Sequence, residues 1–325
     1  MWLVTGATGH IGNVLVRKLL ERGEKVRALI LPGESRESIS GLKVEAFEGD
    51  ILNLDSVFES MRGIKGIFHL AGVISIMPGP NPFVRKVNVE GTKNILRAAS
   101  EKKIKLIYTS SIHAIQRVDA SAGMIDESVP YDMNNPYGAY DRSKAEATLE
   151  VLNAARSGLE AVVTCPTGVI GPYDFRRSMM GAVIHDAAAA KPTLYVDGAY
   201  DFVDVRDVAD GLIAAAEHGK RGESYILSGQ KITVRYMLET VREITGKNFF
   251  QMKIPFDLAK FAAVFTPMYY QLAKATPRFT PYSLEVLQSN SNISHAKATR
   301  ELGYTPRSLF ESIKDTVKWF LEKKQ

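Results

Sequence analysis

The chain has 325 residues, 45% hydrophobic and 24% charged, a composition typical of a globular protein with a large core. Its 41 basic and 36 acidic residues leave a net charge of +5, and the charges are dispersed without any nucleic-acid-binding motif, so we expect no nucleic-acid partner. Cys165 is the only cysteine, which excludes an internal disulfide, and an apolar strand beginning at Trp2 leaves no room for a signal peptide, so we expect a cytoplasmic protein.

The first expected element is an apolar strand over residues 2–5 that runs directly into Gly6, Gly9 and Gly12. Glycine allows a tight turn and leaves room for a phosphate close to the backbone. The helix expected over 11–22 then presents unpaired N–H groups and the positive end of its dipole, which favour a pyrophosphate. The spacing G-x-x-G-x-x-G differs from the usual G-x-G-x-x-G, yet the turn still predicts a dinucleotide site.

Short apolar strands alternate with amphipathic helices through the first half of the chain. We expect strands over residues 2–5, 25–31, 43–47, 66–70, 105–110 and 160–165, and helices over 11–22, 53–62, 81–102 and 137–157. This alternation predicts an α/β fold, namely a Rossmann-type doubly wound parallel sheet that binds ligands beyond the carboxyl ends of its strands.

After about residue 171 the pattern becomes mostly helical. We expect helices over 206–218, 233–245, 256–273, 294–302 and 308–323, and a strand over 223–227. The chain therefore divides into a dinucleotide-binding Rossmann domain over 1–170, with a returning segment near 200–230, and a smaller, mostly helical substrate-binding lobe over 171–325.

The most apolar stretch is Ile254–Ala273, which also carries Asp257, Lys260 and two prolines. These residues make it a poor membrane span, so we expect none. A helix packed in the core of the lobe or in a subunit contact is the first interpretation. A helix covering an apolar substrate pocket is the second, and a helix on a membrane surface is the third.

Tyr140 and Lys144 are four residues apart at the start of the helix that follows the fifth strand, so their side chains share one face. A phenol beside an ammonium group has a stabilised anion, and we expect the pKa of Tyr140 to fall toward the working pH. Such a phenol can act as general acid or base on an alcohol or carbonyl. Ser111 follows the fifth strand and can hold the substrate oxygen against Tyr140; Ser110 or Thr109 takes that role if the register differs by one step.

Several motifs resemble the extended short-chain dehydrogenase/reductases of the NAD-dependent epimerase/dehydratase superfamily, in family order and over nearly the whole chain. They are Thr5–Gly12, Gly49–Ile51, His69–Gly72, Val87–Thr92, Thr109–Ser111, Tyr140-x-x-x-Lys144 and Cys165–Pro172. The resemblance implies a catalytic triad of Ser111, Tyr140 and Lys144 and a nicotinamide cofactor. It also implies that this cofactor is bound by Gly6, Thr8, Gly9, His10, Ile11, Gly12, Asp50, Ile51, Leu70, Ala71, Gly72, Asn88, Thr109, Tyr140, Lys144, Pro166, Gly168 and Val169. Asn88 either supports the site or only ties a helix to a neighbouring strand.

In proteins of this fold an acidic residue at the end of the second strand binds the adenosine 2′-hydroxyl of NAD, and a basic residue binds the 2′-phosphate of NADP. The second expected strand ends with neither. Ile30 stands where the resemblance implies Asp in NAD-specific relatives, and Leu31 where many NADP users carry Arg. Arg36, in the loop beyond, is either a phosphate ligand or a solvated loop residue. Because the site has no acidic side chain that would repel a phosphate, we expect NADP or NAD as the cofactor, with a slight preference for NADP. We expect Leu31 and Arg36 to lie at the adenosine end of this cofactor.

The segment Cys165–Pro172 looks like that of the dihydroflavonol reductase and 3β-hydroxysteroid dehydrogenase branch rather than that of nucleotide-sugar enzymes. The candidate pocket walls are apolar, namely the loop over 73–80 and Tyr173, Phe175, Met179 and Met180. Arg176 and Arg177 favour instead a substrate diphosphate. We expect hydride transfer between nicotinamide and a small-molecule ketone, aldehyde or secondary alcohol of apolar character, with a nucleotide-sugar epimerase or dehydratase as the alternative.

The 6 histidines have no acidic or cysteine partners at ligand spacing, so no metal site is expected. His69 is expected to be buried and structural, whereas His113 either contacts substrate or has no role. The resemblance also implies a homodimer through the helices expected over 81–102 and 137–157. A cofactor-binding regulator is the non-catalytic alternative, but such proteins lack the tyrosine–lysine pair that this chain retains.

Overall fold

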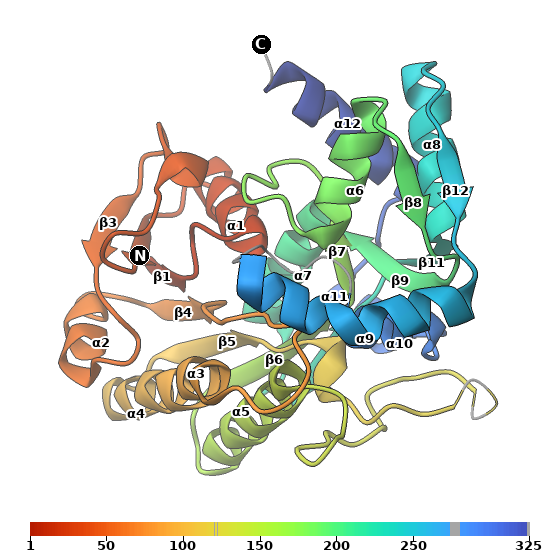
Figure 1. Cartoon of the computed structure of the whole chain (residues 1–325). Coiled ribbons are helices and arrows are strands. Elements are labelled where there is room, and N and C mark those ends of the chain that lie inside the picture. The colour runs from red at the N-terminus through yellow and green to blue at the C-terminus, as the bar shows by residue number, and fades with distance from the viewer. Residues whose placement is uncertain (120, 122, 274–279, 324–325) are drawn as a thin grey trace.

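The computed structural model describes residues 1–119, 121, 123–273 and 280–323. A seven-stranded parallel sheet with the order β10-β6-β5-β4-β1-β2-β3 forms its centre (Figure 1). These strands are β1 (Trp2–Thr5), β2 (Val26–Ile30), β3 (Glu45–Glu48), β4 (Gly66–His69), β5 (Lys105–Thr109), β6 (Ala161–Pro166) and β10 (Ser224–Leu227). The strand order reverses between β1 and β4, where open α/β sheets bind ligands. The predicted doubly wound Rossmann-type sheet is confirmed.

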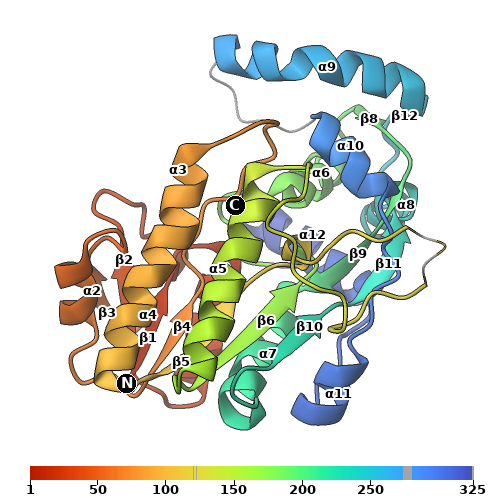
Figure 2. The same cartoon turned by 90° about the horizontal axis from the view of Figure 1, so that it is seen from below.

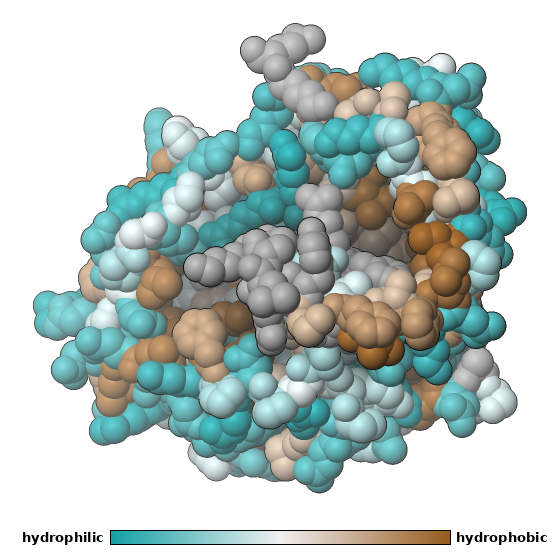
Figure 3. Space-filling model, in the orientation of Figure 1, coloured by the Kyte–Doolittle hydropathy of each residue, from teal (hydrophilic) through white to brown (hydrophobic). Residues whose placement is uncertain are grey.

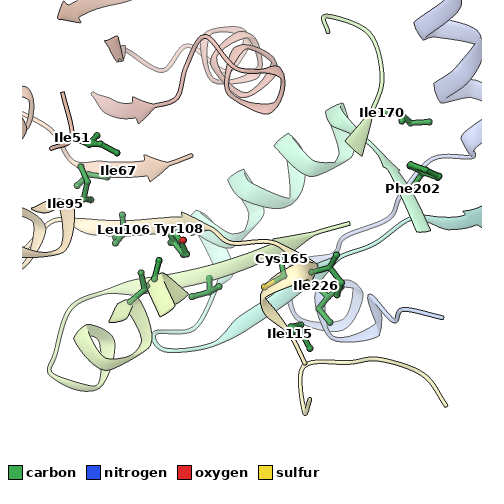
Figure 4. Close-up of a cluster of buried hydrophobic side chains, with 14 of the residues drawn as sticks. Ile51, Ile67, Ile95, Leu106, Tyr108, Ile115, Cys165, Ile170, Phe202 and Ile226 are labelled. Atoms are coloured by element: carbon green, nitrogen blue, oxygen red, sulfur yellow. The ribbon is translucent and has the colours of Figure 1, made fainter. Parts of the chain in front are cut away.

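Helices cover both faces of the sheet (Figure 2). One face packs against α1 (His10–Glu21), α7 (Val205–His218) and α11 (Ala296–Leu302), and the other against α2 (Leu54–Ser60), α4 (Gly91–Lys102) and α5 (Ala139–Arg156). Alternate strand residues therefore enter two different apolar clusters. In Figure 4, Leu106, Tyr108, Cys165 and Ile226 from neighbouring strands line one of them. Strands buried on both faces are continuously apolar, which explains why the sequence pattern identified them.

The helix expected over 81–102 is interrupted. The chain instead forms α3 (Pro82–Arg85), a π-helical turn over Lys86–Glu90, and then α4. A π turn adds a residue to the helical turn, a local change that hydrophobic periodicity does not reveal. Asn88 lies in this turn and points to the site described below.

The second half of the chain contains short strands that the sequence analysis did not identify. A three-stranded sheet of the order β11-β9-β7 and a parallel pair of β12 and β8 lie beside the main sheet. Their strands are β7 (Gly168–Ile170), β8 (Thr193–Tyr195), β9 (Ala199–Asp204), β11 (Gln230–Thr233) and β12 (Gln251–Lys253). The helices here are α6 (Met179–Ala188), α8 (Val234–Thr245), α9 (Phe256–Ala273), α10 (Pro281–Gln288) and α12 (Leu309–Glu322). All of these strands except β9 have only three or four residues, which is too short to show alternation. In β9, which has six residues, five consecutive residues are buried, so alternation is absent there too.

The first interpretation of the most apolar helix combined core packing with a subunit contact; core packing is wrong for its described side chains, and the subunit contact stays a prediction. Among these side chains, α9 buries only Ala259 and Ala263, which pack with Val196 and Leu284. Its large apolar side chains face outward instead. No helix in the described part of the chain is long and apolar enough to cross a membrane.

Candidate active site

The turn after β1 packs directly against the end of β4. Gly6 has a φ of +69°, and a Cβ atom there would lie 2.8 Å from the backbone nitrogen of Ala71. A Cβ atom on Gly12 would overlap the carbonyl oxygen of Gly6, so α1 can approach the turn only with glycine at that position. Gly9 caps α1 without a side-chain hydrogen bond, which leaves the first N–H groups of the helix available for an anion.

Side chains from α1 fix this turn against the segment that follows β7. Asn13 Nδ2 donates to the carbonyl oxygens of Gly9, at 2.8 Å, and Tyr173, at 3.2 Å. His10 Nε2 lies 3.0 Å from the carbonyl oxygen of Pro172. The turn and first helical turn thus contain a group of predicted cofactor ligands: Gly6, Thr8, Gly9, His10, Ile11 and Gly12. A preformed loop at an uncapped helix N-terminus fits the pyrophosphate of a dinucleotide.

A buried chain of hydrogen bonds fixes the end of β4. Thr5 Oγ1 lies 2.7 Å from His69 Nδ1 and accepts hydrogen bonds from the backbone N–H groups of Leu70 and Ala71. Thr92 Oγ1 donates to the carbonyl oxygen of Asn88, so it accepts from His69 Nε2 at 3.0 Å. Burial lowers the pKa of His69 to about 3, which keeps the ring neutral. His69 is therefore structural, as expected.

Asn88 ties the loop after β4 to α5. Its Nδ2 donates to the carbonyl oxygen of Val73 at 3.0 Å and to Ser143 Oγ at 2.9 Å, and its Oδ1 accepts from the backbone N–H of Val73 at 2.7 Å. A Cβ atom on Gly72 would lie 3.1 Å from Asn88 Oδ1 and 3.7 Å from Lys144 Nζ. Because protein groups occupy both ends of the amide, Asn88 positions the loop beside the site.

The structure brings Ser111, Tyr140 and Lys144 together beyond the carboxyl end of β5. Ser111 begins a short 3-10 turn, Ile112–Ala114, and accepts a hydrogen bond from the backbone N–H of His113 at 3.2 Å. Tyr140 and Lys144 lie near the start of α5, and Lys144 Nζ donates to the carbonyl oxygen of Thr109 at 2.8 Å. All three side chains are buried. Ser110, the alternative to Ser111, is bonded to Thr148 instead, at 2.5 Å.

The expectation that the pKa of Tyr140 falls toward the working pH is wrong for this structure. Burial raises the pKa of Tyr140 to about 12; a hydrogen bond from Ser111 opposes the rise and the charge of Asp141 adds to it. Burial also lowers the pKa of Lys144 to about 8. Desolvation dominates both shifts because it penalises the charged form of each group. At neutral pH the site therefore holds a protonated phenol and an ammonium group.

His113 is positioned next to Tyr140 by two tyrosines from distant parts of the chain. Its ring stacks on that of Tyr200 with an interplanar angle of 11°, and its Nε2 lies 3.1 Å from the Tyr200 hydroxyl. Its Nδ1 lies 3.2 Å from the hydroxyl of Tyr282, which donates its proton to Asp141 at 2.6 Å. Nδ1 must then be the donor to Tyr282, and Nε2 accepts from Tyr200. Burial lowers the pKa of His113, which agrees with a neutral ring.

Asp141 is a fully buried carboxylate that follows Tyr140 directly. Arg117 donates to its Oδ2 at 3.1 Å, and the Arg117 guanidinium lies 3.7 Å from the centroid of the Tyr137 ring. The charge of Asp141 is therefore paired. No motif in the sequence indicated Arg117, Tyr200 or Tyr282, because their common neighbours are far away along the chain.

At the adenosine end of the crevice, the predicted residues lie around the ends of β2 and β3. The Leu31 side chain is half-exposed, and Arg36 forms an ion pair with Glu48. Asp50 Oδ1 accepts from the backbone N–H of Leu52 at 2.8 Å, and Ile51 is buried.

Arg176 contacts the glycine turn. Its Nη2 donates to Thr8 Oγ1 at 3.0 Å and also pairs with Glu34, which lies in the loop after β2. This places the guanidinium beside the proposed cofactor site, whereas its predicted role was to bind a substrate diphosphate. Sequence reasoning missed Glu34, because it lies in the loop beyond the end of β2 and not at the strand end where an acidic residue is expected.

Two of the candidate pocket walls pack elsewhere. The guanidinium carbon of Arg17 lies 4.6 Å from the centroid of the Tyr173 ring. The centroid of the Phe175 ring lies 5.2 Å from that of Trp319 on α12. These aromatic side chains therefore join α1 to α12. The remaining predicted cofactor neighbours are Pro166 at the end of β6, and Gly168 and Val169 in β7. The described residues contain no cluster of three or more possible metal ligands.

The chain is similar in sequence and in fold to several known proteins. Residues 2–228 match the model of the NAD dependent epimerase/dehydratase family. The chain is 34% identical over 325 residues to the "Sterol demethylase protein B" of Methylococcus capsulatus, covering 99% of this chain and 98% of the relative. It is 28% identical to a "3 beta-hydroxysteroid dehydrogenase/Delta 5-->4-isomerase" of Mycobacterium tuberculosis, covering 94% and 85%. The crystal structure of gox2253 is 33% identical, with a TM-score of 0.84 over 99% of this chain and 98% of that chain.

Proposed function

Because the chain belongs to the NAD-dependent epimerase/dehydratase family and is an NAD(P)-dependent enzyme, we propose that it transfers a hydride between the nicotinamide and an apolar ketone, aldehyde or secondary alcohol. The observation that carries this proposal is the buried group of Ser111, Tyr140 and Lys144 beyond the carboxyl end of β5. The names of the sterol and hydroxysteroid relatives support an apolar substrate.

The side chains have separable roles in this reaction. Ser111 donates a hydrogen bond to the substrate oxygen and holds it next to the phenol. In reduction, Tyr140 gives its proton to the oxygen as negative charge develops there; in oxidation, the phenolate takes the proton. Lys144 stabilises the phenolate and binds the nicotinamide ribose. When bound, NAD(P) donates or accepts the hydride.

The test is turnover of a substrate panel by purified wild-type protein and Tyr140→Phe. We expect wild type to oxidise or reduce apolar alcohols and ketones, 3-hydroxysteroids among them, and Tyr140→Phe to lose at least about 100-fold in kcat, the typical contribution of a general acid or base. Tyr236→Phe, at an exposed tyrosine on α8, is the matched control. Unchanged NADPH binding by Tyr140→Phe would show that its site is intact. Full activity of Tyr140→Phe on these substrates would refute the mechanism.

The alternative is a nucleotide-sugar epimerase or dehydratase, which the description of the matching family model favours. Its argument from sequence relied on Arg176 and Arg177. The Arg176 guanidinium contacts Thr8 and Glu34 at the glycine turn, and Arg177 is exposed. A UDP- or dTDP-sugar copurifying with the protein, or turned over by it, would establish the alternative and overturn our proposal.

For the cofactor we propose NADP over NAD. Arg36 is exposed at the adenosine end and would exchange its partner Glu48 for a 2′-phosphate. Glu34 carries a charge that would oppose this phosphate, but its ion pair with Arg176 offsets that charge. Fluorescence titration with NADPH and NADH tests the preference. Arg36→Ala should weaken NADPH binding and leave NADH binding unchanged; tighter NADH binding by wild type would refute it.

We further propose a cytoplasmic homodimer that assembles through α4 and α5. The free, buried thiol of Cys165 agrees with a reducing compartment. Light scattering tests the assembly: a single species of monomer mass would refute it.

A further inference from the structure

Helix α9 differs from an ordinary surface helix because its large apolar side chains face outward and its small residues face the protein. The buried face consists of small residues, Ala259 and Ala263. The opposite face exposes five large apolar side chains: Leu258 58%, Phe261 66%, Val264 64%, Phe265 54% and Met268 61%. At ~100° per residue these five lie within a sector of about 120° centred opposite the alanines. They form what we call the outer face of α9.

The outer face is a continuous patch on a convex part of the molecule. Taking ~150–200 Å² for a fully exposed large side chain, it presents roughly 500 Å² of apolar surface, a size that usually marks an interaction site. Figure 2 shows α9 standing out from the body as its outermost element, and Figure 3 shows apolar surface over it. A convex apolar ridge is suited to a deformable surface.

The charges at the outer face are of both signs. Lys260 flanks it and forms no ion pair with the described residues, whereas Lys253, just before the helix, has a half-exposed side chain that pairs with Asp197 at 3.2 Å. Asp257, the one acidic residue on α9, falls within the sector of the outer face in the first helical turn. Apolar residues flanked by lysines are typical of helices that lie in the headgroup region of an anionic bilayer.

The helix is also connected to the candidate active site. Ala259 and Ala263 of α9 pack with Leu284 of α10. Tyr282, two residues earlier on α10, contacts His113 and Asp141. Thr280, which caps α10, donates to the carbonyl oxygen of Ile76 in the apolar loop after β4. A surface bound by α9 would therefore lie beside the substrate side of the crevice.

From this arrangement we propose that the outer face of α9 binds the surface of an anionic lipid bilayer, so that the enzyme is a peripheral membrane protein. Leu258, Phe261, Phe265 and Met268 enter the boundary between headgroups and acyl chains, and Lys253 and Lys260 contact lipid phosphates. The proposal goes beyond the proposed function and does not depend on the reaction catalysed.

Vesicle sedimentation with the full chain tests the proposal. The probes are vesicles of phosphatidylcholine with and without phosphatidylglycerol. We expect the wild type to bind both, more strongly with the anionic lipid. Phe261→Ser combined with Phe265→Ser should weaken binding to both at least about tenfold, given ~25 cal/mol per Å² of apolar surface. Lys260→Gln should reduce only the increment due to phosphatidylglycerol.

The matched control exchanges two exposed apolar residues away from α9, Met124→Ser with Leu321→Ser, and should bind vesicles as the wild type does. Unchanged NADPH titration shows that each variant is folded, so loss of vesicle binding is distinguishable from failure of the proposed function. Absence of wild-type binding to either vesicle would overturn the proposal. So would a dimer in light scattering that Phe261→Ser with Phe265→Ser dissociates, since a second copy would then cover the helix.

Discussion

Replacement of Lys144 by Met should stabilise the protein while it removes activity. The Lys144 side chain is buried, donates one hydrogen bond to the Thr109 carbonyl oxygen at 2.8 Å, and has no carboxylate partner among the described residues. Burial lowers its pKa from 10.5 to about 8, a difference of about 2.5 pH units. At ~1.4 kcal/mol per unit, burying the ammonium costs about 3 kcal/mol. Loss of the hydrogen bond to Thr109 destabilises the variant by about 1 kcal/mol, so the expected net gain in the free energy of unfolding is about 2 kcal/mol.

The gain should depend on pH in a defined direction. Below pH 8 the folded and unfolded chains both bind the proton, so the full cost is present at pH 7. Between pH 8 and 10.5 the unfolded chain binds more protons than the folded one. Lys144 therefore destabilises the wild type less and less as pH rises through this window.

The assay is thermal unfolding of wild type and Lys144→Met at pH 7 and at pH 9.5, followed by circular dichroism. We expect the variant to melt a few degrees higher at pH 7 and the difference to shrink at pH 9.5. Lys318→Met, at an exposed lysine on α12, controls for loss of a surface charge. A lower melting temperature for Lys144→Met at pH 7, or a difference that does not vary with pH, would refute the reasoning.

Three further substitutions test other parts of the site. Gly12→Ala should abolish dinucleotide binding in fluorescence titrations, because its methyl group would overlap the Gly6 carbonyl oxygen and push α1 away; binding like that of wild type would contradict this. Tyr282→Phe leaves buried Asp141 with one partner fewer, so urea unfolding should show a loss of ~1–3 kcal/mol; equal stability would mean that a water replaces the hydroxyl. Arg176→Ala should raise the dissociation constants of both NADH and NADPH, because its contact with Thr8 lies at the pyrophosphate end, and that of NADPH more, because Glu34 loses the partner that offsets its charge; unchanged binding of both cofactors would contradict this.

Local sequence patterns were sufficient for the parts of the site that lie at strand ends. Gly6 and Gly12 are identifiable because a tight strand–turn–helix leaves no space for a Cβ atom. Tyr140 and Lys144 share a helix face by their spacing alone. The strands of the main sheet other than the exposed edge strand β3 were found because burial on both faces makes them largely apolar.

Orientation and long-range contacts were not accessible in the same way. Periodicity showed that residues 256–273 form an apolar helix, but alanine and phenylalanine both count as apolar, so it did not reveal that the alanines face inward. Spacing did not show that burial raises the pKa of Tyr140, because burial depends on the whole fold. Tyr200 and Tyr282 meet at His113 only after the second half of the chain has folded onto the first.

The contacts of Tyr282 with His113 and Asp141 couple the second half of the chain to the proposed catalytic residues in the first half. Asp141 follows the proposed general acid directly, and its buried charge is held by Arg117 and by Tyr282 of α10. His113, which is hydrogen-bonded to Tyr282, has its ring 6.3 Å from that of Tyr140. Any shift of α10 would therefore leave a buried carboxylate with fewer partners and would move a ring next to Tyr140, both at a cost in free energy. The position of α10 and the geometry of Tyr140 are coupled, so a substrate that contacts α10 can affect the proton-transfer step without touching the phenol.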